Sequence, residues 1–184
     1  MKSHCYRQLS KAFLLIILAF LLDSCALFRK KKEETYHNYP PNNKSNPPAS
    51  KNYNSRTVNE LIGTARQYIG VPYRSGGIDG NGMDCSGLLF TTFKQVGFSL
   101  PRISWQQSEV GKDIDIDELR PGDLVFFVTN KGNVSNINHS GMITEIRNPK
   151  EVYFIHASSS KGIREDNLFT TYWMSCFAKA KRPF

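Results

Sequence analysis

Cys85 lies in a sequence setting that favours nucleophilic chemistry. It follows Asp84, and apolar residues at Leu88, Leu89 and Phe93 come after it at helical spacing, which predicts that the thiol lies in the first turn of a helix. The unpaired N–H groups and the dipole at a helix N-terminus favour an anion, so we expect this position and a nearby histidine to lower the pKa of the thiol. The same N–H groups can stabilise the oxyanion of a tetrahedral intermediate. These features predict covalent catalysis by Cys85.

A cysteine nucleophile needs a base, and two histidines are candidates. His139 opens a predicted strand beside small residues, and His156 ends the next predicted strand, on the face that it shares with Val152 and Phe154 by alternation. Two adjacent strands can bring both imidazoles together, with His139 as the base and His156 as the polar group that orients it. His37 lies in a polar segment and is not expected to take part.

Three different arrangements of the same residues are also compatible with the sequence. Each histidine could be an ordinary strand-end residue with satisfied hydrogen bonds. Cys85 and Cys176, the two cysteines expected in the folded domain, could form a disulfide in an oxidising compartment. A zinc site of Cys85 with His139 and His156 is conceivable, but zinc ligands usually occur in pairs a few residues apart, and Cys85 and His139 are 54 positions apart. We expect no metal and no other cofactor.

Two helices are predicted to carry the nucleophile and to support it. The first begins at Thr57, where Thr57 and Glu60 have the spacing of a capping box, and apolar residues then recur at helical intervals until Gly70 ends the helix. A glycine-rich loop over residues 76–82 leads to the second helix, which begins near Cys85 and which Gly97 ends.

Strands are predicted to carry the base. Ser104 and Gln107 form another capping pair for a short third helix. After Pro121 and Gly122 the spacing of apolar residues changes from helical to strand-like. Alternating and apolar patterns then predict strands over residues 123–128, 140–146, 151–156 and 176–181. Helices followed by antiparallel strands predict an α+β fold, with N-terminal helices packed on an antiparallel sheet.

The N-terminus has the layout of an export signal. Basic residues precede an apolar run from Ala12 to Leu22, which is too short to cross a bilayer because a spanning helix needs about 20 apolar residues. Residues 22–25 resemble the lipobox of bacterial lipoproteins, although Asp23 departs from its usual small or apolar residue. We therefore expect a signal peptide over residues 1–24, lipidation of Cys25 and a lipid anchor in the periplasm, at the outer membrane. Secretion without acylation is the alternative.

Residues 25–56 are predicted to form a disordered tether behind the lipidated cysteine. From residue 29 onward this segment has no Ile, Leu, Val, Met, Phe or Trp, and it contains two Pro-Pro pairs. Such a stretch cannot bury enough apolar surface to offset the entropy lost on ordering. The catalytic domain is therefore expected over residues 57–184.

Composition is compatible with one globular domain. The chain has 184 residues, of which 40% are hydrophobic, and this supplies one core rather than two. The formal net charge is +8, but the basic residues after position 57 are scattered singly and form no stripe interleaved with aromatic residues. This pattern argues against nucleic-acid binding. We expect a monomer.

Six short motifs run through residues 57–184, in the order Pro72-Tyr73 with Gly76-Gly77, Asp84-Cys85-Ser86-Gly87, Leu100-Pro101-Arg102, Leu119-Arg120-Pro121-Gly122-Asp123-Leu124, His139-Ser140-Gly141-Met142 and Phe154-Ile155-His156-Ala157-Ser158. Together they resemble the NlpC/p60 family of cell-wall cysteine endopeptidases. The resemblance implies a papain-like α+β fold in which Cys85, His139 and His156 are the nucleophile, the base and the third polar residue.

The same resemblance extends to residues around the catalytic group. It implies that Tyr73 directs its hydroxyl at the active site and helps the oxyanion. It also implies a substrate groove lined by Asp84, Ser86, Arg102 and Ser104.

Two residues depart from the family pattern. Ser75 stands where the family often has an aromatic residue, which would alter a substrate subsite. Ser140 stands where the family usually has Val, which is expected to alter only packing.

The function implied by the resemblance is hydrolysis of peptidoglycan. Family members cut amide bonds in stem peptides, commonly between D-glutamate and a diamino acid, and in some lipoprotein members the cross-link between stems. We expect Cys85 to act on one of these bonds through a thioester. The alternatives are a catalytically silent wall-binding or regulatory lipoprotein, and an amidase or acyltransferase of the same fold.

Overall fold

The computed structural model describes residues 55–129 and 136–184. Within them the helices are α2 (Ser55–Arg66), α3 (Cys85–Gln95), α4 (Ser104–Gln107) and α5 (Thr171–Cys176), with a 3-10 turn η1 (Ile116–Glu118). The strands are β1 (Ile78–Asp79), β2 (Gly82–Met83), β3 (Lys112–Ile114), β4 (Leu124–Phe127), β5 (His139–Asn148), β6 (Glu151–Ser158), β7 (Gly162–Asn167) and β8 (Phe177–Arg182). The predicted signal peptide, Cys25 and the tether up to residue 54 lie outside the described residues.

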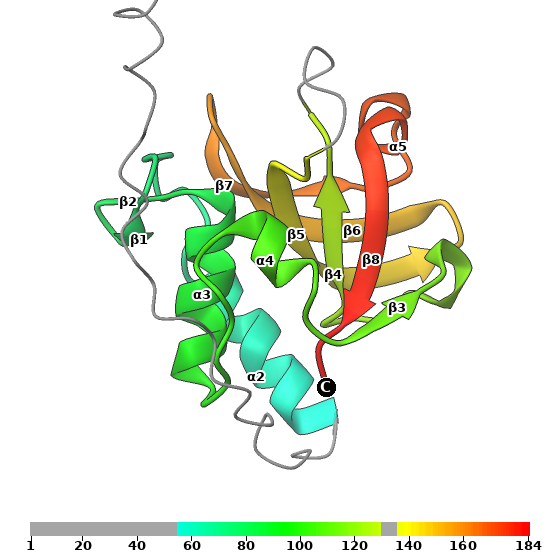
Figure 1. Ribbon diagram of the computed structural model, residues 1–184, viewed down its shortest axis with the longest axis horizontal. Coiled ribbons are helices and arrows are strands. Elements are labelled where there is room, and N and C mark those ends of the chain that lie inside the picture. Colours follow the sequence, from blue (N-terminus) through cyan, green and yellow to red (C-terminus); the bar gives the residue numbers. More distant parts are fainter. Residues whose placement is uncertain (1–54, 130–135) are drawn as a thin grey trace, which may run out of the picture. The chain divides into compact units, whose positions relative to one another are not determined.

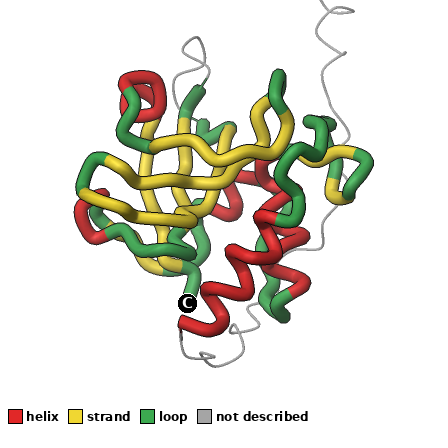
Figure 2. The backbone as a smooth tube through the Cα atoms, turned by 180° about the vertical axis from the view of Figure 1, so that it is seen from behind, coloured by secondary structure: helices red, strands yellow, loops and turns green. Residues whose placement is uncertain are grey.

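Six strands form one antiparallel sheet, in the order β3-β8-β4-β5-β6-β7. Helices α2 and α3 pack together on one side of this sheet (Figure 1), and α3 contacts both β5 and β6. Seen from behind, the strands run across the domain with these helices along one side of them (Figure 2). The predicted α+β arrangement, N-terminal helices on an antiparallel sheet, is therefore confirmed.

Alternation along the strands divides the core into two clusters, one on each face of the sheet. In β4, Leu124 and Phe126 join the cluster that packs against α2 and α3, whereas Val125 and Phe127 join the other cluster. The same alternation holds in β6, where Phe154 lies in the second cluster. All five side chains are buried, so the centre of the sheet is covered on both faces.

The helix boundaries differ from those predicted. Helix α2 begins at Ser55, so Thr57 lies inside the helix and the predicted capping box at Thr57 is wrong. The helix ends at Arg66 and a turn leads to Gly70, which leaves Ile69 half exposed instead of on the packed face. Ser104 is the first residue of α4 and Ile103 is its N-cap, without a side-chain cap, so the second predicted capping pair is also wrong.

Several elements were not predicted from the sequence. They are the β1–β2 hairpin, β3, β7 and α5. Their apolar patterns are weak because they are short or, like β7, rich in charged residues. Strand β6 also continues two residues beyond His156, which was expected to end it.

Within the described part of the chain, no helix combines the length and the hydropathy needed to span a bilayer.

Candidate active site

Helix α3 presents Cys85 at its N-terminus, as predicted. Asp84 is the N-cap in an extended conformation, and its Oδ1 accepts a hydrogen bond of 2.7 Å from the Gly87 N–H. This bond satisfies one of the N–H groups that a helix leaves unpaired at its start. Cys85 is only 8% exposed, yet it reaches the pocket described below.

A charged clamp fixes the start of α3. Arg102 donates from Nη1 to Asp84 Oδ1 at 2.9 Å and from Nη2 to Asp84 Oδ2 at 2.8 Å, a two-pronged pair that holds the carboxylate in one orientation. The Gly76 N–H donates to Oδ2 at 2.8 Å, and Arg102 also donates to the Ser86 hydroxyl at 2.9 Å. Burial opposes ionisation of Asp84, but the bonds from Arg102 and Gly87 outweigh it and hold the pKa of Asp84 below its usual value.

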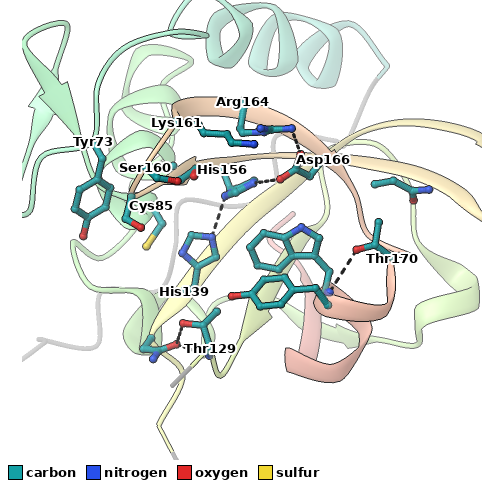
Figure 3. Close-up of a pocket in the computed structure, with 17 residues that line it drawn as sticks. Tyr73, Cys85, Thr129, His139, His156, Ser160, Lys161, Arg164, Asp166 and Thr170 are labelled. Carbon is teal, nitrogen blue, oxygen red and sulfur yellow. Dashed lines mark hydrogen bonds and ion pairs between the residues drawn. The ribbon is translucent and has the colours of Figure 1, made fainter. Parts of the chain in front are cut away.

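The two predicted histidines meet, and an aspartate extends the line. His139 Nε2 and His156 Nδ1 are 3.1 Å apart, and His156 Nε2 lies 3.0 Å from Asp166 Oδ2 (Figure 3). A carboxylate only accepts hydrogen bonds, so His156 carries its proton on Nε2 and accepts on Nδ1. His139 must then donate from Nε2, which leaves its Nδ1 as the unprotonated nitrogen. The line of hydrogen bonds thus assigns the tautomer that can take a proton.

The free side of His139 faces the thiol. Figure 3 shows the sulfur of Cys85 directed toward the His139 ring, on the side away from His156. Trp173 packs against both imidazoles: its ring is stacked on His139 with a centroid separation of 5.4 Å, and it lies edge-on to His156 at 4.8 Å. Trp173 therefore limits how far either ring can rotate.

The pKa values of Cys85 and His139 do not favour the thiolate that the sequence predicted. Burial raises the pKa of Cys85, although hydrogen bonds from the Ser140 and Ser86 N–H groups and the Ser140 hydroxyl act in the opposite direction. Burial, followed by the nearby His156, lowers the pKa of His139 from 6.5 to about 3. The expected fall in the thiol pKa is thus wrong, because desolvation exceeds the stabilisation available at the helix end. The free site holds a neutral thiol beside a neutral imidazole.

Ser140 makes hydrogen bonds that connect strand β5 to the nucleophile and to Gln107. It is buried, and its hydroxyl lies 3.3 Å from Gln107 Oε1. Hydrogen bonding from its N–H and its hydroxyl to the Cys85 sulfur also opposes the rise in the pKa of the thiol. Gln107 in turn donates to the Ser86 carbonyl at 2.9 Å, and so links the strand to helix α3. The expectation that Ser140 alters only packing is therefore wrong.

The site opens into a pocket of about 640 Å³. Cys85, His139, His156 and Asp166 all line it, together with Tyr73 on one side and the β6–β7 hairpin on the other. Tyr73 is 40% exposed and borders the pocket beside Cys85, and the help of its hydroxyl to the oxyanion stays a prediction. Burial raises the pKa of the Tyr73 hydroxyl, and Cys85 and Asp84 add to the effect, so this hydroxyl stays protonated and able to donate.

The four predicted substrate contacts lie outside this pocket lining. Asp84, Ser86 and Arg102 are joined to one another in the clamp, and Ser104 is buried at the start of α4. Their role as direct substrate contacts stays a prediction.

The geometry also bears on the disulfide and the zinc site that the sequence left open. Cys85 and Cys176 are both free thiols, and they lie in different core clusters. The ring nitrogens by which His139 and His156 could share a metal face each other instead. Among residues 55–129 and 136–184, no group of three or more Cys, His, Asp or Glu side chains is arranged to hold a metal ion.

A comparison with protein families decides the identity of the domain. The model of the NlpC/P60 family matches residues 70–182, which span both Cys85 and the two histidines. The chain belongs to the NlpC/P60 family.

Individual NlpC/P60 relatives agree with this assignment. The chain is 37% identical over 170 residues to a protein of Escherichia coli K12 named "Probable endopeptidase NlpC", covering 92% of this chain and 97% of the relative. It is 40% identical over 86 residues to the gamma-D-glutamyl-L-lysine dipeptidyl-peptidase of Bacillus subtilis, but spans only 29% of that protein. It is 39% identical over 114 residues to the murein DD-endopeptidase MepS/murein LD-carboxypeptidase of E. coli K12, spanning 56% of it.

Solved NlpC/P60 structures have the same fold. A family protein from Bacillus cereus superposes with a TM-score of 0.61 at 31% identity, over 68% of this chain and 39% of that one. A lipoprotein-like family member from Staphylococcus aureus also gives 0.61, at 28% identity, over 76% of this chain and 44% of that one.

Two members of this NlpC/P60 site were not predicted from the sequence. Asp166 lies on β7, a strand that was not predicted, and only the pairing of β6 with β7 brings it next to His156. Trp173 lies on α5, which was also not predicted. A signal for Asp166 was present, since Arg164 and Asp166 alternate in a short segment after a Ser-rich turn, as residues on one face of a hairpin strand do.

Proposed function

We propose that this protein is a cysteine endopeptidase that hydrolyses amide bonds in the stem peptides of peptidoglycan, between D-glutamate and the diamino acid or at the cross-link between stems. The relatives named above carry peptidase names, and two of these names specify murein or gamma-D-glutamyl substrates. The observation that supports the proposal most strongly is the line of Cys85, His139, His156 and Asp166 along one pocket.

The first half of the reaction acylates the thiol. His139 Nδ1 takes the proton from Cys85 as the sulfur attacks the scissile carbonyl carbon, because the resting thiol is neutral and needs a base at the moment of attack. The carbonyl oxygen gains negative charge, which N–H groups at the start of α3 and the Tyr73 hydroxyl stabilise. The C–N bond then breaks, the leaving amine receives the proton from His139, and a thioester remains on Cys85.

The second half releases the acyl product. His139 takes a proton from water, and the resulting hydroxide attacks the thioester carbon. The C–S bond breaks, the sulfur recovers its proton from His139, and the carboxylic acid product leaves. The imidazolium that forms transiently is stabilised by the His156–Asp166 pair, because the Asp166 carboxylate supplies a negative charge at the end of this line.

Mass spectrometry of digested muropeptides tests the proposal. The native domain should convert stem peptides or cross-linked dimers into products of defined mass, and the mass names the bond that is cut. Cys85→Ala should abolish this conversion, while its circular dichroism spectrum and its melting temperature stay close to native. A product pattern that is the same for both proteins contradicts the proposal.

The same digestion separates the rival functions. A silent wall-binding lipoprotein yields no product with either protein, and its thiol resists alkylation at neutral pH. An amidase releases whole stems from the glycan, and an acyltransferase transfers the acyl group to an added amine or alcohol rather than to water. Each of these outcomes replaces the endopeptidase assignment.

We also propose that the protein is exported and anchored through lipid on Cys25 in the periplasm, at the outer membrane, and that it acts as a monomer. The support is the sequence layout of residues 1–25. Labelling with a palmitate analogue in a bacterial host should mark the full chain and not Cys25→Ala, and membrane fractionation should place the label in the outer membrane. Light scattering of the catalytic domain should give the mass of one chain. An unlabelled native chain contradicts the anchor.

A further inference from the structure

The hairpin between β6 and β7 forms a rigid rim of the pocket. Gly162 adopts φ 69°, and a Cβ added there would lie 2.3 Å from the Val71 carbonyl oxygen, so this close contact requires glycine. The Gly70 N–H donates to the Ile163 carbonyl at 2.9 Å, and the Ile163 N–H donates to the Val71 carbonyl at 2.9 Å. These bonds hold the hairpin against residues 70–71, the segment that leads into Tyr73. Tyr73 and the hairpin line the same pocket as Cys85.

Two cationic side chains lie on this rim. Lys161 is at the tip of the hairpin and Arg164 follows on β7, and both line the pocket with Cys85 (Figure 3). Lys161 is exposed and has no ion-pair partner within the described residues. Arg164 pairs with Asp166 through Nη2, while its Nε is buried without an acceptor among the described residues. Lys161 thus has donors that this part of the protein does not use, and the Arg164 side chain, although paired with Asp166, is still 36% exposed where it lines the pocket.

The charge of the pocket lining favours an anion. Asp166 is the one acidic residue among the described residues that line the pocket, and both of its oxygens are engaged, by His156 and by Arg164. Two cations against one carboxylate leave one net positive charge when both imidazoles are neutral. The arginine at the start of α3 is in a different situation from Arg164. Both Nη groups of Arg102 donate to the Asp84 carboxylate, so its charge is paired within the protein.

We propose that Lys161 and Arg164 form a subsite that binds a free carboxylate of the stem peptide next to the scissile bond. This inference rests on the proposed function. In a gamma-glutamyl linkage the α-carboxylate stays free, four bonds from the scissile carbonyl carbon, which is at most about 5 Å. A diamino acid on the leaving side can also carry a carboxylate. Either group meets the same chemistry, a lysine ammonium and an arginine fork.

Paired substrates test the subsite and distinguish these two sources. One pair of synthetic stem peptides differs only in the glutamate α-group, carboxylate or carboxamide, and a second pair differs in the same way on the diamino acid. Native enzyme should cut the carboxylate member of one pair with kcat/KM at least about tenfold higher, the effect of one charge-assisted hydrogen bond. The pair that shows the preference identifies which carboxylate is bound.

Variants assign the preference to the two cations. Lys161→Met should lower kcat/KM about tenfold more on the carboxylate substrate than on the amide substrate, and Lys161→Glu should reverse the preference. Arg164→Lys keeps the charge but loses the planar fork, and it should reduce the carboxylate-to-amide ratio even if it also slows both substrates through Asp166. Lys150→Met removes an exposed charge at the opposite end of β6 and should leave the ratio at its native value.

The outcomes separate this subsite from the proposed function. A native enzyme that cuts none of the four peptides and no muropeptide contradicts the proposed function itself. A native enzyme that cuts carboxylate and amide peptides equally well, or Lys161 and Arg164 variants that keep the native ratio, overturns the subsite and leaves the endopeptidase assignment standing.

Discussion

At the scale of single residues, the direction of each hydrogen bond matters as much as the distance. Asp166 can only accept from His156, and this determines which nitrogen of His156 accepts from His139 and which nitrogen of His139 is left for the thiol. Asp166 acts through His156 and does not touch the substrate in this scheme, so it is a positioning residue. Its charge also favours the imidazolium that forms during the reaction.

Asp166→Asn should lower kcat at least about tenfold, because the amide carries no charge and can donate as well as accept. The acidic limb of the pH–rate profile should also move to lower pH, since losing the carboxylate disfavours protonation of His139, the base. Kinetics across the pH range check both effects. Asp113→Asn is the control, because Asp113 is an exposed carboxylate that pairs with Lys181 far from the pocket lining. An Asp166→Asn enzyme with a native profile would show that the carboxylate is only structural.

Ser140→Val replaces the buried hydroxyl near the thiol with a side chain of similar size. The pKa of Cys85 should rise, because one of the groups that stabilise its anion is lost. The pH dependence of alkylation by iodoacetamide measures this shift. Thr144→Val, a buried hydroxyl on the same strand that donates to the Tyr153 carbonyl, should leave the alkylation profile unchanged. Coincident profiles for native protein and Ser140→Val would mean that the hydroxyl does not act on the sulfur.

At the scale of elements, the placement of the nucleophile depends on how α3 begins. Asp84 joins three segments: it caps α3, accepts from the Gly76 N–H in the glycine-rich loop and pairs with Arg102. Gly77 and Gly87 make this close approach possible, because a Cβ at Gly87 would lie 2.0 Å from the Gly77 carbonyl oxygen. The glycines around the cysteine thus bring the loop against the helix start.

Arg102→Met should destabilise the domain by about 3 kcal/mol, since it leaves the largely buried Asp84 carboxylate without its partner. Urea unfolding at neutral pH measures the free energy of unfolding. Arg74→Met breaks an exposed pair with Asp79 and should cost less than about 1 kcal/mol. Equal losses for the two variants would refute a structural role for the clamp and would favour the substrate-groove role predicted for Arg102.

At the scale of the whole molecule, packing keeps the His139 imidazole neutral, because its ring lies against Phe127 and Trp173 and is desolvated there. A histidine whose pKa is depressed on folding stabilises the folded state above its unfolded pKa, and this stability is lost as the pH falls toward the folded pKa. For His139 the window runs from about 6.5 down to about 3. The carboxylates of Asp84 and Asp166 also have lowered pKa values, so their contribution is lost only below about pH 4.

The free energy of unfolding should therefore fall by about 2 kcal/mol between pH 6.5 and pH 4.5, at up to about 1.4 kcal/mol for each pH unit and proton. Urea unfolding at a series of pH values gives this slope. His139→Asn removes the titrating group and should flatten the curve over that interval, while the steeper loss below about pH 4 should remain. A native protein with constant stability from pH 6.5 to pH 4.5 would contradict burial of a neutral His139.

The sequence alone determined the fold class, the nucleophile at a helix start and the pairing of His139 with His156. Each of these follows from local signals: helical spacing after Cys85, strand alternation around His156, and motifs in family order. The helix starts predicted at Thr57 and Ser104 were less accurate, because capping residues also occur inside helices when tertiary packing supplies the stability.

Tertiary structure alone decided the rest of the site. Asp166, Trp173 and the cationic rim lie on segments with weak local patterns, and they approach the histidines only through the pairing of β6 with β7 and the packing of α5. The protonation states of Cys85 and His139 also depend on the tertiary structure. A helix end favours a thiolate over a distance of one turn, but desolvation depends on every atom that surrounds the sulfur, and those atoms come from segments distant in the sequence.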